Sequence, residues 1–228
     1  MVAVGNPDTA AHVSTMVPGL NTELEDVPGL MLHRAENLQD VADDLTPEAG
    51  DVSVIAWLDY DAPEGYTDDA NLSVVGHSYG STTTGWAAAH GDGLAVDDLV
   101  VAGSPGTTVD HAADLHIDRR RVWAGAAPDD DVANYFPGTV HGDDPTALRF
   151  EANQFHVDTS GHGNYWEKDP SGLPSQSLAN QAAIITGDYD YFDANPGALD
   201  HTSDQAAAGP PRPAPPREPA PYGPPPQR

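Results

Sequence analysis

Residues Leu72–Ser81 read Leu-Ser-Val-Val-Gly-His-Ser-Tyr-Gly-Ser, and this stretch decides the fold prediction. A short apolar, β-branched run is followed at once by Gly-x-Ser-x-Gly, centred on Ser78, and then by a helix-compatible segment from Thr82 to His90. A strand, a tight turn and a helix in this order are the context of a nucleophile elbow, which projects a serine hydroxyl above the edge of a sheet. We therefore predict that Ser78 is a covalent nucleophile for acyl transfer.

A second serine, Ser104, also follows a predicted strand and is the rival nucleophile. Its neighbour Pro105 has no backbone N–H that could help to form an oxyanion hole. Gly-x-Ser-x-Gly alone is a modest signal. The prediction that Ser78 is the nucleophile therefore depends mainly on the strand before it and the helix after it. Ser104 therefore ranks below Ser78.

Strands and helices alternate on both sides of the elbow. The alternation predicts an α/β fold, α/β-hydrolase-like, with a mostly parallel sheet and helices on both faces. The expected strands are His12–Val17, Val52–Leu58, Leu72–Val75, Leu99–Ala102 and Arg121–Ala126. The expected helices are one within Glu25–Leu45 that begins near Pro28, one over Ser81–His90, and one over Ser177–Thr186 that ends at Gly187.

One connection is unusually short, because only residues 61–71 join the second expected strand to the third. A crossover between parallel strands needs a dozen or more residues, usually with a helix, and this segment is rich in Pro, Gly and Asp. We predict a shortened crossover that leaves one sheet face without its covering helix. Exposed apolar surface there would favour a homodimer.

The chain carries 36 acidic and 9 basic residues, a formal net charge of -27. Such a field repels nucleic acid and anionic lipid, which excludes both as partners. The absence of cysteine excludes disulfides and thiol catalysis. No stretch is apolar enough to span a bilayer, and the N-terminus lacks the features of a secretory signal, so we expect a cytoplasmic protein.

Ten of the 22 prolines fall between Pro210 and Pro226. Such a composition cannot pack and favours an extended, solvated chain. We therefore predict a catalytic domain over residues 1–205 and a disordered Pro-rich tail over residues 206–228. A role of the tail as a Pro-rich ligand for a partner module stays open.

A serine nucleophile needs a histidine base and an acid, in the chain order Ser, acid, His. The acid is expected after the last predicted strand, where Pro128–Val132 contains three consecutive aspartates. The base is expected on the loop Gly161–Tyr165, because its glycines allow a tight turn around His162. His141, in Val-His-Gly-Asp-Asp, is the rival base.

The remaining elements of the site are backbone groups. The N–H of Tyr79, directly after the nucleophile, is the first expected oxyanion donor, and the N–H of Leu20, in the loop after the first strand, is the second. We expect His77 to pack against the top of the sheet and His156 to be structural. No His-Glu-x-x-His spacing and no Gly-rich phosphate loop occurs, so we expect no metal and no cofactor.

Taken together, these motifs resemble the actinobacterial α/β-hydrolase family of the DUF1023 type. The resemblance implies a serine-hydrolase fold in which the nucleophile falls on Ser78, the acid, which follows Ala-Pro-x, falls on Asp130, and the base falls on His162. Family members usually have a longer helical segment before the nucleophile strand, and often further sequence upstream. The matching stretches, in order along the chain, are Val-Pro-Gly after the first strand and residues 56–63, 74–83, 103–106, 141–145 and 161–165.

The function predicted from these residues is hydrolysis of a small-molecule or lipid-like acyl ester through an acyl-enzyme. Two alternatives stay open. The shortened crossover motivates a degenerate, non-catalytic interaction module, whereas an amidase or peptidase would use the same triad. The approach of His162 to Ser78 separates the catalytic from the non-catalytic alternative.

Overall fold

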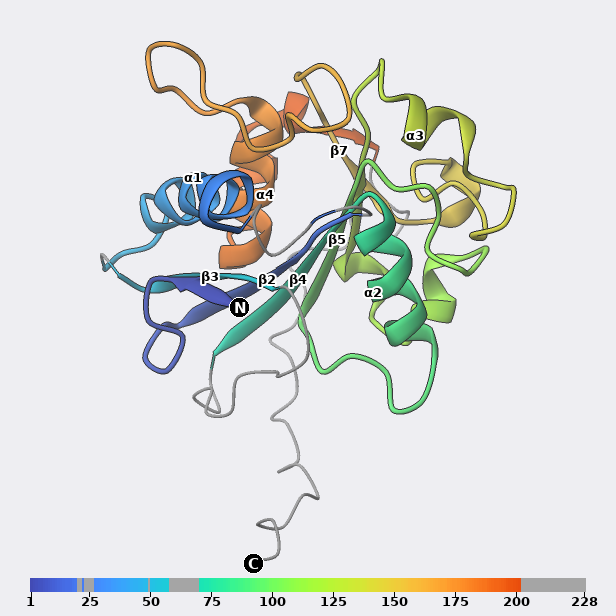
Figure 1. The fold of residues 1–228 in the computed structure, drawn as a ribbon, viewed down its shortest axis with the longest axis horizontal. Helices are drawn as coiled ribbons and strands as arrows, with labels where there is room; N and C mark the ends of the chain where they lie inside the picture. The colour runs from blue at the N-terminus through green and yellow to red at the C-terminus, as the bar shows by residue number, and fades with distance from the viewer. Residues whose placement is uncertain (20–21, 23–26, 49, 58–69, 202–228) are drawn as a thin grey trace, which may run out of the picture.

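A computed structural model describes residues 1–19, 22, 27–48, 50–57 and 70–201. The predicted tail and residues 58–69, which include most of the short connection, lie outside the described residues. Within the described part, one eight-stranded sheet has the order β1-β3-β2-β4-β5-β6-β7-β8 (Figure 1). The strands are β1 Val2–Val4, β2 His12–Val17, β3 Val52–Ala56, β4 Asn71–His77, β5 Asp98–Ala102, β6 Val122–Gly125, β7 Asn153–Phe155 and β8 Leu199–His201.

The sheet is parallel from β3 to β7, and the two edge strands β1 and β8 pair antiparallel with it. This confirms the predicted mostly parallel sheet. Every residue of β3, β5 and β6 is buried, as expected for parallel strands that are covered on both faces. The strands that the sequence did not reveal, β1, β7 and β8, have three residues each, which is too short for a period to be recognised.

Helices cover both faces of the sheet, as predicted (Figure 1). Helices α1 and α4 pack together on one face, and α2 lies on the other. The largest apolar cluster fills the α1–α4 side, and a second cluster fills the α2 side. The helices are α1 Leu32–Asp43, α2 Tyr79–Ala89, α3 Asp131–Tyr135, α4 Gln176–Thr186 and α5 Asp190–Ala194, with a π-helical turn Val27–Met31 before α1 and short 3-10 turns at Ala112–Leu115, Arg119–Arg121, Leu148–Phe150 and Pro196–Ala198.

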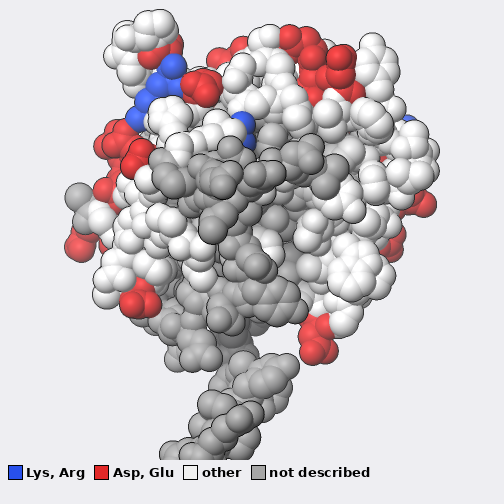
Figure 2. Space-filling view, in the orientation of Figure 1, with Lys and Arg blue, Asp and Glu red and all other residues white. Residues whose placement is uncertain are grey.

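Acidic residues greatly outnumber basic ones in the chain, 36 to 9. Figure 2 shows acidic side chains scattered around the margin of one face, with few Lys and Arg residues among them. Helix α2 carries no charged residue at all. Among the described residues, no helix combines the length and the apolarity that crossing a bilayer requires.

A buried aspartate ties the amino-terminal ends of β5 and β6 to the turn before α5. Asp98 is fully buried and accepts hydrogen bonds from Arg121 Nη1 at 3.0 Å and Trp123 Nε1 at 2.9 Å. The hydroxyl of Tyr189 donates to the same carboxylate at 2.6 Å. The carboxylate thus satisfies three donors from two separate segments, which makes it a structural anchor.

We expect Asp98→Ala to lower the free energy of unfolding by about 3–5 kcal/mol, because it leaves the charge of Arg121 unpaired in the interior. The matched control is Asp118→Ala, which breaks an ion pair with Arg120 that is partly exposed on both sides. Exposed pairs of this kind contribute less than about 1 kcal/mol. Urea denaturation measures both values, and equal losses would contradict the anchoring role of Asp98.

Candidate active site

Ser78 occupies the sharp turn between β4 and α2. Its backbone has φ 55° and ψ -131°, a region that is sparsely populated for residues with a side chain and costs about 1–3 kcal/mol. Gly80 lies so close to β2 that an added Cβ would be 2.2 Å from the carbonyl oxygen of Val17. A strained serine on a strand-to-helix turn, followed by a glycine that permits close packing, is the geometry of a nucleophile elbow.

His162 lies beside this turn, on the loop between β7 and α4. Its Nε2 is 2.7 Å from Ser78 Oγ, and its Nδ1 is 2.9 Å from both carboxylate oxygens of Asp130. A carboxylate only accepts hydrogen bonds, so Nδ1 carries the proton of the neutral ring. Nε2 is then free to accept from the Ser78 hydroxyl, which is the tautomer that a general base requires.

Asp130 caps the amino terminus of α3 and is fully buried. Its Oδ1 accepts from the backbone N–H groups of Val132 at 2.9 Å and Ala133 at 3.2 Å. Its Oδ2 accepts from the Tyr165 hydroxyl at 2.5 Å. Burial by itself would raise the pKa of Asp130, but the hydrogen bonds, that of His162 first, lower it to about 2. The carboxylate is therefore ionised at neutral pH.

The predicted oxyanion donors are backbone groups near Ser78. Tyr79 is the first residue of α2, where a backbone N–H has no acceptor within the helix. Gly19 lies against Ser78, because an added Cβ would be 2.7 Å from Ser78 Cβ and 3.0 Å from Ser78 Oγ. The chain after β2 thus reaches Ser78. Leu20 lies outside the described residues, so its N–H stays a predicted donor.

The structure gives the rival residues other contacts. Ser104 is buried, and its Oγ accepts from the Ser81 hydroxyl at 2.7 Å and from a backbone N–H. The ring of His141 packs edge-on against the ring of Tyr79, with centroids 5.5 Å apart. His156 pairs with Asp200 at 2.8 Å on an exposed surface. The geometry therefore groups His162, and not these residues, with Ser78.

Two contributors to the site escape prediction from the sequence. Tyr165 donates to Asp130 and also accepts from the backbone N–H of Ala127 at 3.0 Å. Asp129 accepts from Ser160 and from the N–H of Gly161, at 2.5 and 2.7 Å. The one signal for Tyr165 is its place in the Gly-His-Gly-Asn-Tyr motif. Within the described ranges, no three acidic or histidine side chains converge to hold a metal ion.

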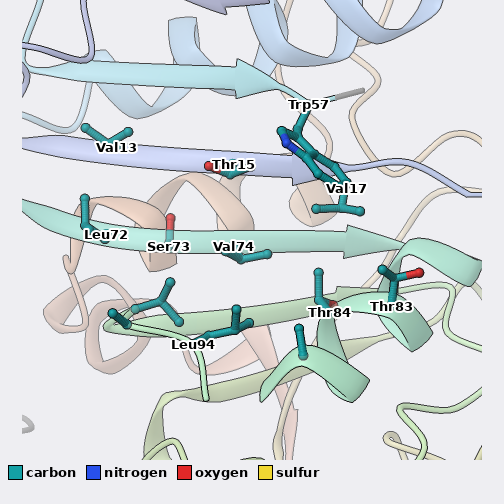
Figure 3. A pocket seen from close by; sticks show the side chains of 13 residues that line it. Val13, Thr15, Val17, Trp57, Leu72, Ser73, Val74, Thr83, Thr84 and Leu94 are labelled. Atoms are coloured by element: carbon teal, nitrogen blue, oxygen red, sulfur yellow. The ribbon is translucent and has the colours of Figure 1, made fainter. Parts of the chain in front are cut away.

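A cavity of about 450 Å³ lies on the sheet face that carries α2 (Figure 3). Val13 and Val17 of β2 line it along the strand, opposite Leu72 of β4. Trp57 lies at the end nearest the elbow, where Thr83 of α2 also faces the cavity. The cavity is mainly apolar, and at the end near Trp57 it lies beside the first turns of α2.

The parallel sheet, the strained serine and the adjacent histidine and aspartate define the α/β-hydrolase class. A sequence profile of a family described as "Alpha/beta hydrolase" matches residues 1–71 and 64–140, more than half of the chain. The chain belongs to this family.

Two mycobacterial proteins are similar in sequence, in agreement with the resemblance to an actinobacterial family. The uncharacterized protein Rv2079 of Mycobacterium tuberculosis is 36% identical, over 58% of this chain and 25% of the relative. The uncharacterized protein Mb0988c of Mycobacterium bovis is 32% identical, over 60% of this chain and 63% of the relative. The chain thus spans less than two thirds of either relative.

A solved structure is also similar, the esterase domain from a Rhodothermus marinus protein. It is 12% identical, with a TM-score of 0.42, and the match covers 81% of this chain and 88% of that domain.

Proposed function

We propose that the chain is a serine-dependent carboxylic-ester hydrolase that works through an acyl-enzyme. The observation that carries the proposal is the 2.7 Å contact between Ser78 Oγ and His162 Nε2, with Asp130 on the opposite ring nitrogen. The same contact favours catalysis over the non-catalytic alternative, for which a histidine out of reach would have been the signature.

In the first half of the reaction, His162 Nε2 takes the proton of Ser78 while Oγ forms a bond to the ester carbonyl carbon. The carbonyl oxygen becomes negative and is held by the N–H of Tyr79 and by the predicted N–H of Leu20. One such donor is worth about 3 kcal/mol of barrier. The tetrahedral intermediate then collapses, the carbon–oxygen bond to the alcohol breaks, and the alcohol leaves with the proton from His162.

In the second half, His162 takes a proton from water, and the resulting hydroxide oxygen bonds to the acyl carbon. Collapse of this intermediate breaks the bond to Ser78, returns the proton to Oγ and releases the carboxylic acid. Throughout, the ionised Asp130 stabilises the positive charge that forms on His162. An amide substrate would use the same groups, so amide turnover is a separate arm of the assay.

The experiment combines labelling by a fluorophosphonate probe with turnover of p-nitrophenyl esters from acetate to dodecanoate and of the matching anilides. We expect labelling and ester turnover that exceeds anilide turnover. Wild-type protein that reacts with neither the probe nor any ester would overturn the proposal. Faster anilide turnover would assign the site to the amidase alternative.

The apolar cavity supports an ester with an apolar chain as the substrate. Val13 to Val17 spans roughly 13 Å at the rise of a β-strand, so the cavity is long enough to cover several methylene groups. Each buried methylene is worth about 0.8 kcal/mol, which is roughly a fourfold gain in kcat/KM. Octanoate esters should therefore be preferred over acetate esters.

We expect Ala87→Trp, which fills the cavity from α2, to lower kcat/KM for the octanoate ester by about tenfold or more and to leave acetate turnover unchanged. Ala89→Trp, on the same helix but away from the cavity lining, is the matched control. Equal effects on both esters would contradict an acyl-chain site. If Ala87→Trp instead converts a dimer into a monomer in sedimentation, with octanoate turnover unchanged, a second copy of the chain covers this face.

A further inference from the structure

The residue before the nucleophile makes a hydrogen bond to the backbone of the base. His77 Nε2 lies 2.6 Å from the carbonyl oxygen of His162. A carbonyl oxygen only accepts, so Nε2 of His77 carries the proton and donates it. The side chain of His77 is 7% exposed, so this bond is largely shielded from competing water.

Aromatic rings and charged groups surround His77. Its ring centroid is 4.8 Å from that of His162, 5.6 Å from that of Tyr165 and 5.3 Å from that of Trp166. Burial lowers the pKa of His77 to about 3, and the charges of Arg34 and His162 act in the same direction, whereas the hydrogen bond to His162 and the charge of Asp130 oppose it. His77 is therefore neutral at neutral pH.

Side chains of α1 and α4 hold the residues that follow His162 in the same loop. Arg34 and Asn37 of α1 donate to the carbonyl oxygens of Gly163 and Trp166, each at 2.8 Å. Gln181 of α4 donates to the carbonyl oxygen of Tyr165 at 3.3 Å. These donors fix the loop to the helices, whereas His77 fixes it to the elbow itself.

We propose that His77 is a positioning residue that holds the backbone of His162 in place relative to Ser78. The proposal rests on the proposed function, because the distance it controls is that between the base and the nucleophile. Ser78 is linked to the carbonyl of His162 by a short path: the peptide bond to His77, the side chain of His77, and its hydrogen bond to that carbonyl. A shift of the loop along this path changes the Nε2–Oγ distance, and a misplacement of about 1 Å at such a contact costs roughly 10²-fold in rate.

Two variants of His77 test the proposal. His77→Leu removes the donor, and we expect kcat for an acyl ester to fall by about 10- to 100-fold with little change in KM, because the loss concerns alignment and not binding. In His77→Gln the amide nitrogen is as many bonds from the backbone as Nε2, and we expect it to restore most of kcat. The control is Asn180→Leu, which removes a buried amide donor to the carbonyls of His156 and Ala198 at 2.9 Å and should leave kcat unchanged.

A measurement that needs no turnover is histidine ¹⁵N NMR on the same proteins. We expect wild-type His77 to carry its proton on Nε2 down to pH 5. The downfield proton on His162 Nδ1, next to Asp130, should be present in wild type and in His77→Gln, and broadened or lost in His77→Leu. A proton on His77 Nδ1, or a His77→Leu protein with unchanged kcat and an unchanged resonance, overturns the positioning role. Wild-type protein that turns over no ester would contradict the proposed function. The NMR result would still test the positioning role of His77 separately.

Discussion

Replacement of Ser78 by alanine should lower kcat for short acyl esters by about four to six orders of magnitude, because it deletes the proposed nucleophilic oxygen. What remains is the contribution of the oxyanion donors and of substrate binding, which do not need Oγ. The fold should survive the change, because alanine fits the same turn and loses one hydroxyl. Steady-state kinetics with p-nitrophenyl acetate measure the loss, and fluorophosphonate labelling should disappear with it.

The control for this experiment is Ser104→Ala, which removes the rival hydroxyl. Ser104 accepts hydrogen bonds from Ser81 and from a backbone N–H, so its loss should cost about 1 kcal/mol of stability and leave labelling intact. Labelling that persists in Ser78→Ala and disappears in Ser104→Ala would move the nucleophile to the other serine. Thermal unfolding of both variants shows whether each is folded when it is assayed.

The elbow could be predicted because everything that builds it is local. A β-branched run, two glycines and a helix-compatible segment specify the strand, the turn and the helix within 20 residues of sequence, and β4 and α2 appear in that order. Unlike the elbow, the acid cannot be chosen from the local sequence alone, because Asp129, Asp130 and Asp131 carry the same side chain. The structure shows how they differ: Asp130 is buried behind His162, Asp129 binds the Gly161 N–H, and Asp131 starts α3 at an exposed position.

The parts that could not be predicted depend on contacts between distant segments. His77 meets the carbonyl of His162 across 85 residues, and Arg34 meets that of Gly163 across 129. No periodicity or spacing encodes such a pair, since each depends on how the helices pack on the sheet. The crossover stays a prediction, because residues 58–69 lie outside the described part of the chain.

Replacement of Asp130 by asparagine should lower kcat at neutral pH by about 10⁴-fold while the geometry is retained. Asparagine caps helices as well as aspartate does. Its side-chain oxygen can therefore still accept hydrogen bonds from the N–H groups of Val132 and Ala133. Its amide nitrogen then takes the place of Oδ2, where it faces His162 Nδ1 and donates to it, while the Tyr165 hydroxyl loses its acceptor there. This places the ring proton on Nε2, which points at Ser78 and can no longer accept from it.

The matched control is Asp129→Asn, one residue earlier in the same turn. Its oxygen can still accept from the Gly161 N–H, so the loop that carries His162 stays attached. We expect kcat to fall less than about tenfold, the equivalent of one neutral hydrogen bond of roughly 1 kcal/mol. Histidine ¹⁵N NMR of Asp130→Asn should show the proton of His162 on Nε2. Equal losses in the two variants, or an unchanged tautomer in Asp130→Asn, would mean that Asp130 holds α3 in place and does not orient the base.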